Sequence, residues 1–255
     1  MGTKKEKNTK GRRKVRKGRL LICLIAVLAL VITVLFILLR TKLFPVKNIT
    51  AQGSEIYSAQ EIIAASGITA GKTPIFSIST DNVLKLFHTK LPYIETVSVK
   101  RKLPDTVVIT VSDAVECFAF SAEDGYYITG ENCRVLNFNE EKPENLIAAT
   151  VPDLEFKTGE IINFNNNGQK ELFDLIAGYT KEKGIKLNSI DLTNSIGISI
   201  SVEDRIEVLL GTNENIKEKI DHLAGMIDSI GDRKGKINLE MWSKNDTKGT
   251  FIAGN

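Results

Sequence analysis

The chain has 255 residues, a formal net charge of +3 and 42% hydrophobic residues, so it is long enough to bury one or two cores. Residues 1–19 hold ten Lys or Arg and one acid, whereas the rest carries 24 basic and 30 acidic side chains. An acidic remainder argues against a nucleic-acid-binding domain, which needs a basic surface. The basic arm (1–19) could touch DNA or RNA, but such arms more often orient a membrane protein and attract anionic lipids.

An uninterrupted apolar run follows the arm, from Leu20 to Leu39, with no charge, Pro or Gly. Twenty helical residues span roughly the 30 Å hydrocarbon core of a bilayer. The run exceeds the apolar region of a signal peptide, and a buried helix of this length is rarely apolar on every face. We therefore predict a single transmembrane helix over Leu20 to Leu39. Because short basic flanks stay in the cytoplasm, the later residues are expected outside.

Residues 44–113 show the pattern of a small domain. Ser58-Ala59-Gln60-Glu61 is a capping box, in which the serine hydroxyl accepts from the Glu61 amide and the glutamate reaches back. The predicted elements are a strand at Val46–Ala51 closed by Gly53, helices that begin at Ser58 and at Ser79 or Thr80, and strands at Ile94–Lys102 and Thr106–Ser112 joined by a Pro104-Asp105 turn. We expect a β-α-α-β-β domain whose helices cover one face of one sheet.

Residues 114–242 are predicted to form a larger domain, mostly of strands in a mixed antiparallel sheet. Helices are expected from Gln169 to about Lys183 and after a cap at Asn213, and a last strand from Ile237 to Trp242. Residues 243–255 are polar and lack a core pattern, so they are expected to form a flexible C-terminal tail. The predicted fold class is α+β.

Common catalytic motifs are absent from the sequence, including the nucleophile elbow, the P-loop, the dinucleotide fingerprint and the zincin helix. His88 and His222 are expected on solvated helix faces, and no cluster has metal-ligand spacing. We therefore expect no enzyme activity, cofactor, metal or small-molecule substrate. Cys23 lies in the apolar run, while Cys117 and Cys133 could pair in an external compartment or stay free.

Several of these segments resemble the FtsQ/DivIB family of bacterial cell division proteins, and the first block resembles a POTRA domain. The resemblance covers roughly residues 20–242 and departs from the family's usual Asp…Gly turn at 127–133. The matching residues are Phe44-Pro45-Val46-x-x-Ile49, Gly53, Ser58-x-x-Glu61-Ile62, Leu91-Pro92-Tyr93-Ile94, Val97-x-Val99-x-Arg101, Leu103-Pro104-Asp105-Thr106, Ile109-x-Val111, Val151-Pro152-Asp153-Leu154, Gly159, Ile206 to Gly211 and Ile237-Asn238-Leu239.

The resemblance implies a non-enzymatic divisome scaffold with a POTRA domain and a β domain. Such proteins bind the bitopic coiled-coil proteins FtsL and FtsB (DivIC in Gram-positive bacteria) and help to control septal peptidoglycan synthesis. A contact with the septal peptidoglycan synthase complex would fit the same role. The implied location is the cell membrane, enriched at the division septum, with the N-terminus in the cytoplasm and the later domains outside.

A partner site is expected at the last predicted strand, because an open sheet edge can accept a partner strand through main-chain hydrogen bonds. The candidate residues are Leu239, Glu240, Met241, Trp242 and Phe251. In the alternative reading, Leu239 and Met241 belong to the core and Trp242 covers it.

Two other functions compete with the division scaffold. A POTRA-bearing chaperone-like receptor or a sensory module would share the anchor and the first domain. A sensor needs an output domain, and the basic arm is too short to fold as one. An anchored enzyme is the third alternative, and it would turn over peptidoglycan in an assay of the part outside the membrane.

Overall fold

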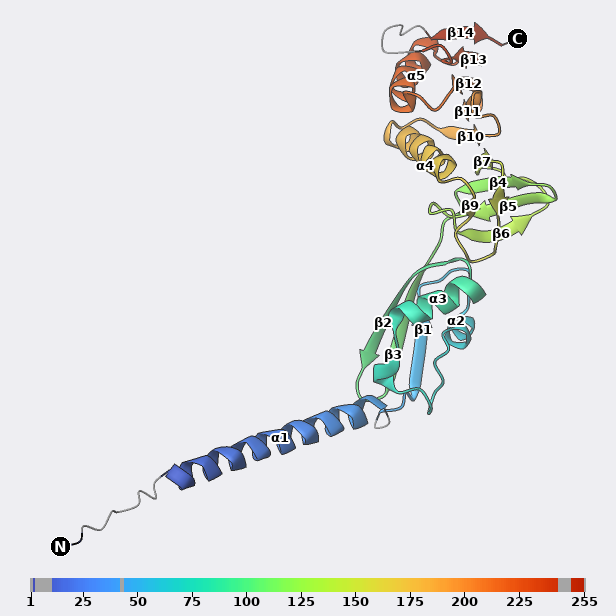
Figure 1. Cartoon of the computed structure of the whole chain (residues 1–255). Coiled ribbons are helices and arrows are strands. Elements are labelled where there is room, and N and C mark those ends of the chain that lie inside the picture. Colours follow the sequence, from blue (N-terminus) through green and yellow to red (C-terminus); the bar gives the residue numbers. More distant parts are fainter. Residues whose placement is uncertain (1, 3–10, 42–43, 243–248, 255) are drawn as a thin grey trace.

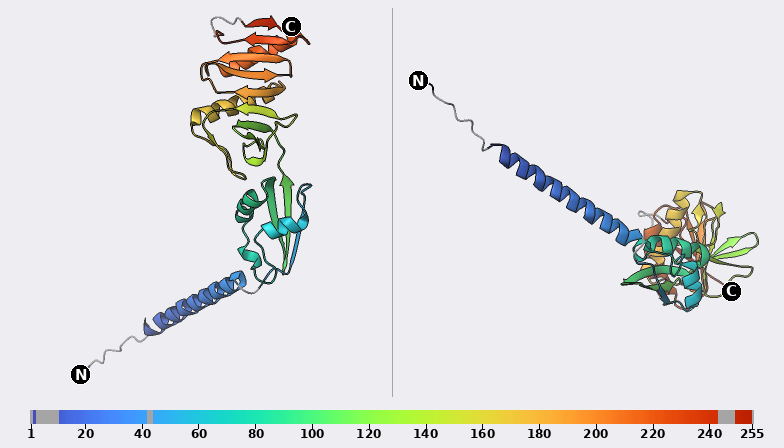
Figure 2. Two further views of the ribbon diagram at one scale, coloured as in Figure 1. Left: turned by 90° about the vertical axis from the view of Figure 1, so that its right-hand side faces the viewer. Right: turned by 90° about the horizontal axis from the view of Figure 1, so that it is seen from below.

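The computed structural model describes residue 2 and residues 11–41, 44–242 and 249–254, and the side chains of the first helix over residues 21–37. Helix α1 (Gly11–Thr41) leads into a first domain, which is followed by a second domain. Figure 2 shows that the first domain meets α1 at one end and the second domain at the other. Within the described residues, no helix is long and apolar enough to cross a membrane.

The first domain has the β-α-α-β-β order expected from the sequence. Its elements are β1 (Asn48–Gln52), α2 (Ala59–Ala65), the short 3-10 helix η1 (Ile75–Ser77), α3 (Thr80–Lys90), β2 (Ile94–Lys102) and β3 (Thr106–Asp113). The sheet order is β1-β3-β2, with β1 parallel to β3 and β2 antiparallel to it. The predicted capping box is present, because Ser58 and Glu61 each accept the other's amide.

One hydrophobic core holds the sheet and helices of the first domain together. The alternation in β3 points Val107, Ile109 and Val111 inward, and Phe87 of α3 is fully buried against them. Because alternate strand residues face opposite sides, this single apolar face explains why both helices contribute to the same core.

The second domain is built on a nine-stranded sheet in the order β14-β13-β12-β11-β10-β7-β4-β5-β6. The strands are β4 (Phe118–Ala122), β5 (Gly125–Thr129), β6 (Val135–Asn139), β7 (Ile147–Thr150), β10 (Leu187–Asp191), β11 (Ile198–Val202), β12 (Ile206–Gly211), β13 (Gly235–Asn238) and β14 (Thr250–Ala253); β8 (Leu154–Glu155) and β9 (Asn163–Phe164) pair separately. The pairs β4·β7, β7·β10 and β12·β13 are parallel, so the sheet is more mixed than expected.

Helices α4 (Asn167–Glu182) and α5 (Ile216–Ile230) lie side by side on one face of this sheet (Figure 1). The predicted cap of the second helix at Asn213 is wrong. The N-cap residue is Asn215, in the left-handed conformation with φ of 56°, which asparagine tolerates better than most residues. Helix α4 is capped by Asn166, whose side chain accepts from the Gly168 amide at 2.9 Å.

The end of the chain differs most from the expectation. The last predicted strand, Ile237 to Trp242, is wrong beyond Asn238, because the Asn238 side chain accepts from the Glu240 amide at 2.9 Å and turns the chain. The predicted flexible tail is wrong for Thr250–Ala253, which form β14. The remaining tail positions 243–248 and 255 lie outside the described residues.

The two cysteines outside the apolar run are not bonded to each other, and the two histidines are less exposed than the sequence predicts. Cys117 and Cys133 are both free, and burial raises the pKa of the Cys133 thiol to about 12. His222 is half-buried, with its ring centroid 6.3 Å from that of Trp242. His88 is half-buried where the two domains meet. The expected solvated faces are therefore wrong for both histidines, since neighbouring segments cover them.

Candidate partner-binding edge

Strand β14 forms one end of the nine-stranded sheet. It pairs antiparallel with β13 through Gly235↔Ala253, Lys236↔Ile252, Ile237↔Phe251 and Asn238↔Thr250. Among the residues that the structure describes, no strand pairs with its outer side. Figure 1 places β14 at the end of the molecule farthest from α1. The other end of the sheet, β6, is bonded to the turn at 159–161, so β14 is the more open edge. The sequence predicted the edge at the strand that is now paired on both sides.

The direction of the β14 amides follows from one hydrogen bond. The Gly254 amide donates to the Lys234 carbonyl at 3.0 Å, so it points toward β13. Successive amides of a strand point to opposite edges. The amides of Ile252 and Thr250 therefore also face β13, and those of Phe251 and Ala253 face outward. Two donors, with the carbonyls of the same two residues, are left at the outer edge for a partner strand.

The predicted site residues gather at this end of the sheet but divide into two groups. Leu239 is fully buried and Trp242 is 8% exposed, so both belong to the core. Met241 is 88% exposed, which contradicts its place in the core under the alternative reading, and Glu240 is also exposed. Phe251 is half-buried, and the Arg233 guanidinium lies 5.2 Å from its ring centroid. Phe251 thus fastens β14 to the core.

Gly235 allows β14 to approach β13 closely. A Cβ atom at this position would lie 2.2 Å from the Ile252 carbonyl oxygen and 2.8 Å from the Phe251 ring. Neither the backbone oxygen nor the packed ring can move without separating the strands. The contact explains a glycine at the first position of β13.

Gly235→Ala is expected to undock β14 while the rest of the sheet survives. The backbone amides of Thr250, Ile252 and Gly254, which face β13, should lose protection from hydrogen exchange by at least about tenfold, because the pairing shown by the register is broken. Gly178→Ala is the matched control, since no heavy atom lies within 4 Å of its added Cβ in α4. Unchanged protection of these three amides in Gly235→Ala would contradict this role.

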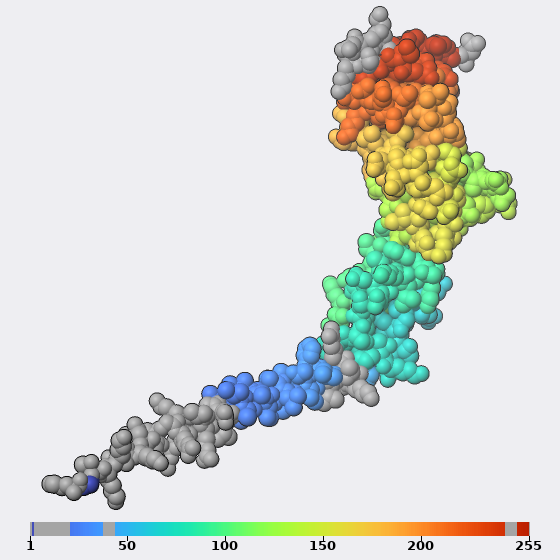
Figure 3. Space-filling model, in the orientation of Figure 1, coloured from blue at the N-terminus to red at the C-terminus, as the bar shows by residue number. Residues whose placement is uncertain are grey.

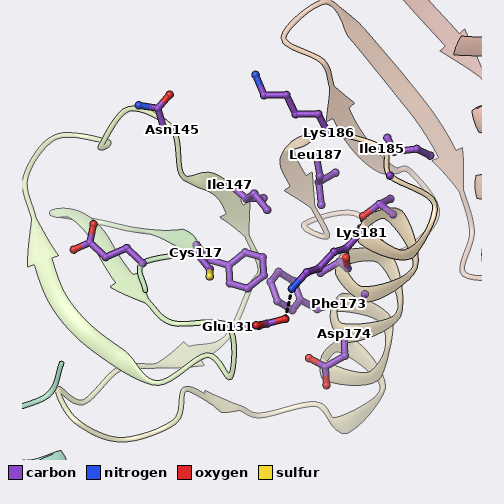
Figure 4. A pocket seen from close by; sticks show the side chains of 16 residues that line it. Cys117, Glu131, Asn145, Ile147, Phe173, Asp174, Lys181, Ile185, Lys186 and Leu187 are labelled. Carbon is purple, nitrogen blue, oxygen red and sulfur yellow. Dashed lines mark hydrogen bonds and ion pairs between the residues drawn. The ribbon is translucent and has the colours of Figure 1, made fainter. Parts of the chain in front are cut away.

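A second candidate functional site is a cavity of about 600 Å³ between helix α4 and the strands β4, β7 and β10. Figure 4 shows Phe173, Ile147 and Leu187 in its wall and the Lys181–Glu131 ion pair, with the lysine nitrogen 2.6 Å from the carboxylate. The Cys117 thiol donates to the Val115 carbonyl at 3.5 Å, and burial raises its pKa. A protonated thiol paired to a carbonyl is a poor nucleophile. No group of metal-ligating side chains occurs among the described residues.

The contact between the two domains, here called the interdomain junction, was not predicted from the sequence. Arg134 is 2% exposed, and its guanidinium pairs with Glu95 at the start of β2. Asn132 donates to the same carboxylate at 3.2 Å. Gly159 packs against the His88 carbonyl, which lies 1.8 Å from the position of an added Cβ. These residues are far apart in the sequence, and Gly159 was noted only as part of the family resemblance.

The comparisons with known proteins agree with this architecture. A model of FtsQ-type POTRA domains matches residues 44–113. The cell division protein DivIB of Clostridium acetobutylicum is 25% identical over 211 residues, covering 79% of this chain and 81% of that protein. The cell division protein DivIB of Clostridium tetani is 24% identical over 226 residues, covering 84% of this chain and 82% of that protein. The chain is similar to DivIB cell division proteins over most of its length and carries an FtsQ-type POTRA domain.

The similarity to DivIB proteins and the POTRA domain support a role in cell division. The first domain is an FtsQ-type POTRA domain, and the second is called the β domain below. The open edge, β14, therefore lies at the far end of the β domain from the POTRA domain.

Proposed function

We propose that the chain is a membrane-anchored, non-enzymatic divisome scaffold at the division septum. It binds FtsL-like and FtsB/DivIC-like bitopic proteins and through them helps to control septal peptidoglycan synthesis. The observation that carries the proposal is the outer side of β14, which no strand of the described residues pairs with and where a partner segment can add as a further strand.

The proposed anchor is Leu20 to Leu39, with the basic arm in the cytoplasm and the ectodomain outside. The described part of this run, 21–37, exposes every side chain, and nearly all of them are apolar. The one hydroxyl, that of Thr33, donates to the Ala29 carbonyl at 2.8 Å. A polar group in lipid must be satisfied within the helix, and this one is. A shared membrane also raises the effective concentration of single-span partners.

The exposed side chains beside the edge suit a selective contact. Met241 is 88% exposed and Ile252 59% exposed, at the same end of the sheet as the open main-chain groups. Main-chain hydrogen bonds would supply affinity, and apolar side chains at alternate positions would supply selectivity. The flexible methionine can adapt its shape to a partner.

Ala253→Pro is expected to weaken binding of the FtsB/DivIC-like partner at least about tenfold. Proline removes the outward amide of Ala253 and leaves the inward amide of Ile252 in place. The measurement is the dissociation constant of the full-length chain and its partner in the same lipid nanodiscs. Ala253→Gly keeps the amide and is the matched control. Equal affinity of the proline and glycine variants, with β14 still protected from hydrogen exchange, would exclude the open edge as the binding site.

A septal scaffold is also expected to concentrate at midcell before constriction. The measurement is the position of a fluorescent fusion to the N-terminal arm through the cell cycle. A uniform membrane signal at every stage would contradict the septal role.

Replacing the Leu20–Leu39 run by an unrelated transmembrane segment should preserve the midcell signal if the span acts only as an anchor.

A further inference from the structure

Three segments meet at the end of the POTRA domain where α1 arrives. The Lys47 amide donates to the Asp105 carbonyl at 2.7 Å, which joins the first segment to the β2–β3 turn. The Val46 amide donates to the Thr73 carbonyl at 2.9 Å, which joins it to the loop before η1. The end of α1 itself lies against η1. We call residues 44–48, 71–74 and 100–105 together the membrane-proximal tip.

The tip presents positive charge and one large apolar side chain to solvent. Lys72 and Lys102 are exposed, and the Lys47 side chain is 70% exposed. Leu103, at the β2–β3 turn, is 64% exposed. Asp105 is the one acid within the described tip, and the Lys47 ammonium lies 3.3 Å from it.

Two further charged residues bear on the charge of the tip, Arg101 within it and Asp81 next to it. Arg101 donates to the carbonyls of Ile75 and Ile78, so its guanidinium is already engaged. Asp81 in the first turn of α3 is exposed and lies on the adjoining segment. The lysines therefore outnumber the acids, although the part of the chain that follows the arm is acidic as a whole.

The chain length keeps the tip near the end of the proposed span. The span ends at Leu39 and the domain begins at Phe44. Five residues reach at most about 18 Å when fully extended. The headgroup region adds about 5–8 Å to each side of the hydrocarbon core. The sequence between them carries Arg40 and Lys42, which add to the positive charge at this level.

We propose that the membrane-proximal tip rests on a bilayer that contains anionic lipids, with Lys72 and Lys102 at the phosphate groups and Leu103 among the headgroups. This inference rests on the proposed anchor. Charges within a Debye length of about 10 Å of an anionic surface are attracted to it, and a neighbouring apolar side chain adds burial. The contact would set the tilt of the POTRA domain and so the height of β14 above the membrane.

The test compares the full-length chain in nanodiscs of phosphatidylcholine and in nanodiscs with about one third phosphatidylglycerol. Hydrogen exchange of peptides that cover 70–73 and 102–106 should slow on the order of fivefold in the anionic discs, the effect of about one lysine near such a surface. Peptides that cover 194–198, in the β domain, should be unchanged. High salt should remove the difference, because it screens exposed charges.

Matched variants distinguish an effect of the tip residues from an effect of the total charge of the protein. The triple variant Lys72→Gln, Lys102→Gln, Leu103→Gln should lose the lipid dependence. The control Lys142→Gln, Lys234→Gln, Ile196→Gln makes the same changes at exposed positions of the β domain and should keep it. Equal exchange of the tip in both lipids would overturn the proposal. The same slowing produced in phosphatidylcholine discs by free glycerol phosphate would overturn it too, because a free anion would then suffice.

The anchor is checked separately by flotation of the full chain with liposomes. A chain that floats but shows no lipid dependence at the tip overturns the tip contact and leaves the anchor standing. A chain that does not float overturns both, because nothing then brings the tip to the bilayer.

Discussion

Gly159→Ala is expected to destabilise the full chain by about 3 kcal/mol, the largest effect among the variants considered. Gly159 has φ of +83°, a conformation that costs other residues about 1–2 kcal/mol. An added Cβ would also lie 1.8 Å from the His88 carbonyl oxygen. That oxygen belongs to α3, so the clash is relieved only if the POTRA and β domains separate.

The turn around Gly159 has little freedom to move aside. The Gly159 amide donates to the Val135 carbonyl at 2.8 Å, and the Val135 amide donates to the Glu160 carbonyl at 2.9 Å. These two bonds fasten the turn to β6. The strain is therefore expected to fall on the interdomain junction.

Gly184→Ala separates the contact from the backbone strain. Gly184 has φ of +69°, and no heavy atom lies within 4 Å of its added Cβ. It should lose only about 1 kcal/mol. Urea unfolding of the full chain in detergent, followed by far-ultraviolet circular dichroism, measures both free energies. Faster proteolysis near the exposed Val115 should accompany the loss in Gly159→Ala. Equal losses in the two variants would show that the contact with His88 contributes nothing.

Glu95→Ala is expected to destabilise the chain by about 2–3 kcal/mol, because it leaves the buried Arg134 without its anion. Arg134 is 2% exposed, and its Nε and Nη1 atoms have no hydrogen-bond partner among the described residues. Because the guanidinium is buried and poorly solvated, the pKa of Arg134 is lowered. Burial, and then the charge of Arg134, lower the pKa of the neighbouring His88. Among the described residues, Glu95 is the carboxylate that pairs with Arg134, so no second anion there takes its place.

The double variant Glu95→Ala, Arg134→Met provides the sharper test. Methionine removes the buried charge and keeps most of the volume, so it should recover most of the loss, since buried ion pairs are often replaced by apolar groups at little cost. Lys157→Ala is the control, because the Lys157–Glu160 ion pair is exposed on both sides and should contribute less than about 1 kcal/mol. If the double variant were no more stable than Glu95→Ala, the unpaired charge of Arg134 could not be the cause of the lost stability.

Both predictions concern the same junction, and the junction matters for the proposed function. The POTRA and β domains follow one another from the end of α1 (Figure 3), so the height of β14 depends on how the domains are joined. A firm junction presents the edge at one height and orientation. A loosened junction should therefore also reduce partner binding at the membrane.

Local sequence patterns predicted most of the secondary structure of the POTRA domain. The capping box at Ser58 and Glu61, the alternation in 94–102 and 106–112 and the order of elements all follow from contacts between residues close in sequence. These signals depend on backbone geometry that a short segment sets for itself. The apolar run and its basic flank are equally local, and the proposed anchor and orientation rest on them.

The candidate site and the junction depended on long-range contacts. Met241 and Trp242 are neighbours in a segment whose sequence predicts a strand. In the structure the Asn238 side chain accepts from the Glu240 amide and ends the strand, and Met241 is then exposed whereas Trp242 is buried. Phe251 and its neighbours form β14 only because β13 offers them an edge and Gly235 lets them approach. From the sequence alone Arg134 would be expected at the surface. The structure buries it and pairs it with Glu95 of the other domain.

The amino-acid sequence by itself determined the long apolar segment, the POTRA domain and the resemblance to a division family, because each depends on local periodicity or on motifs. Only the tertiary structure decided which strand is the open edge and what joins the two domains. A strand edge is defined by what is absent beside it, and a junction by residues that the chain separates by tens of positions. Neither property is encoded in a local pattern, since both depend on the free energy of packing the whole chain.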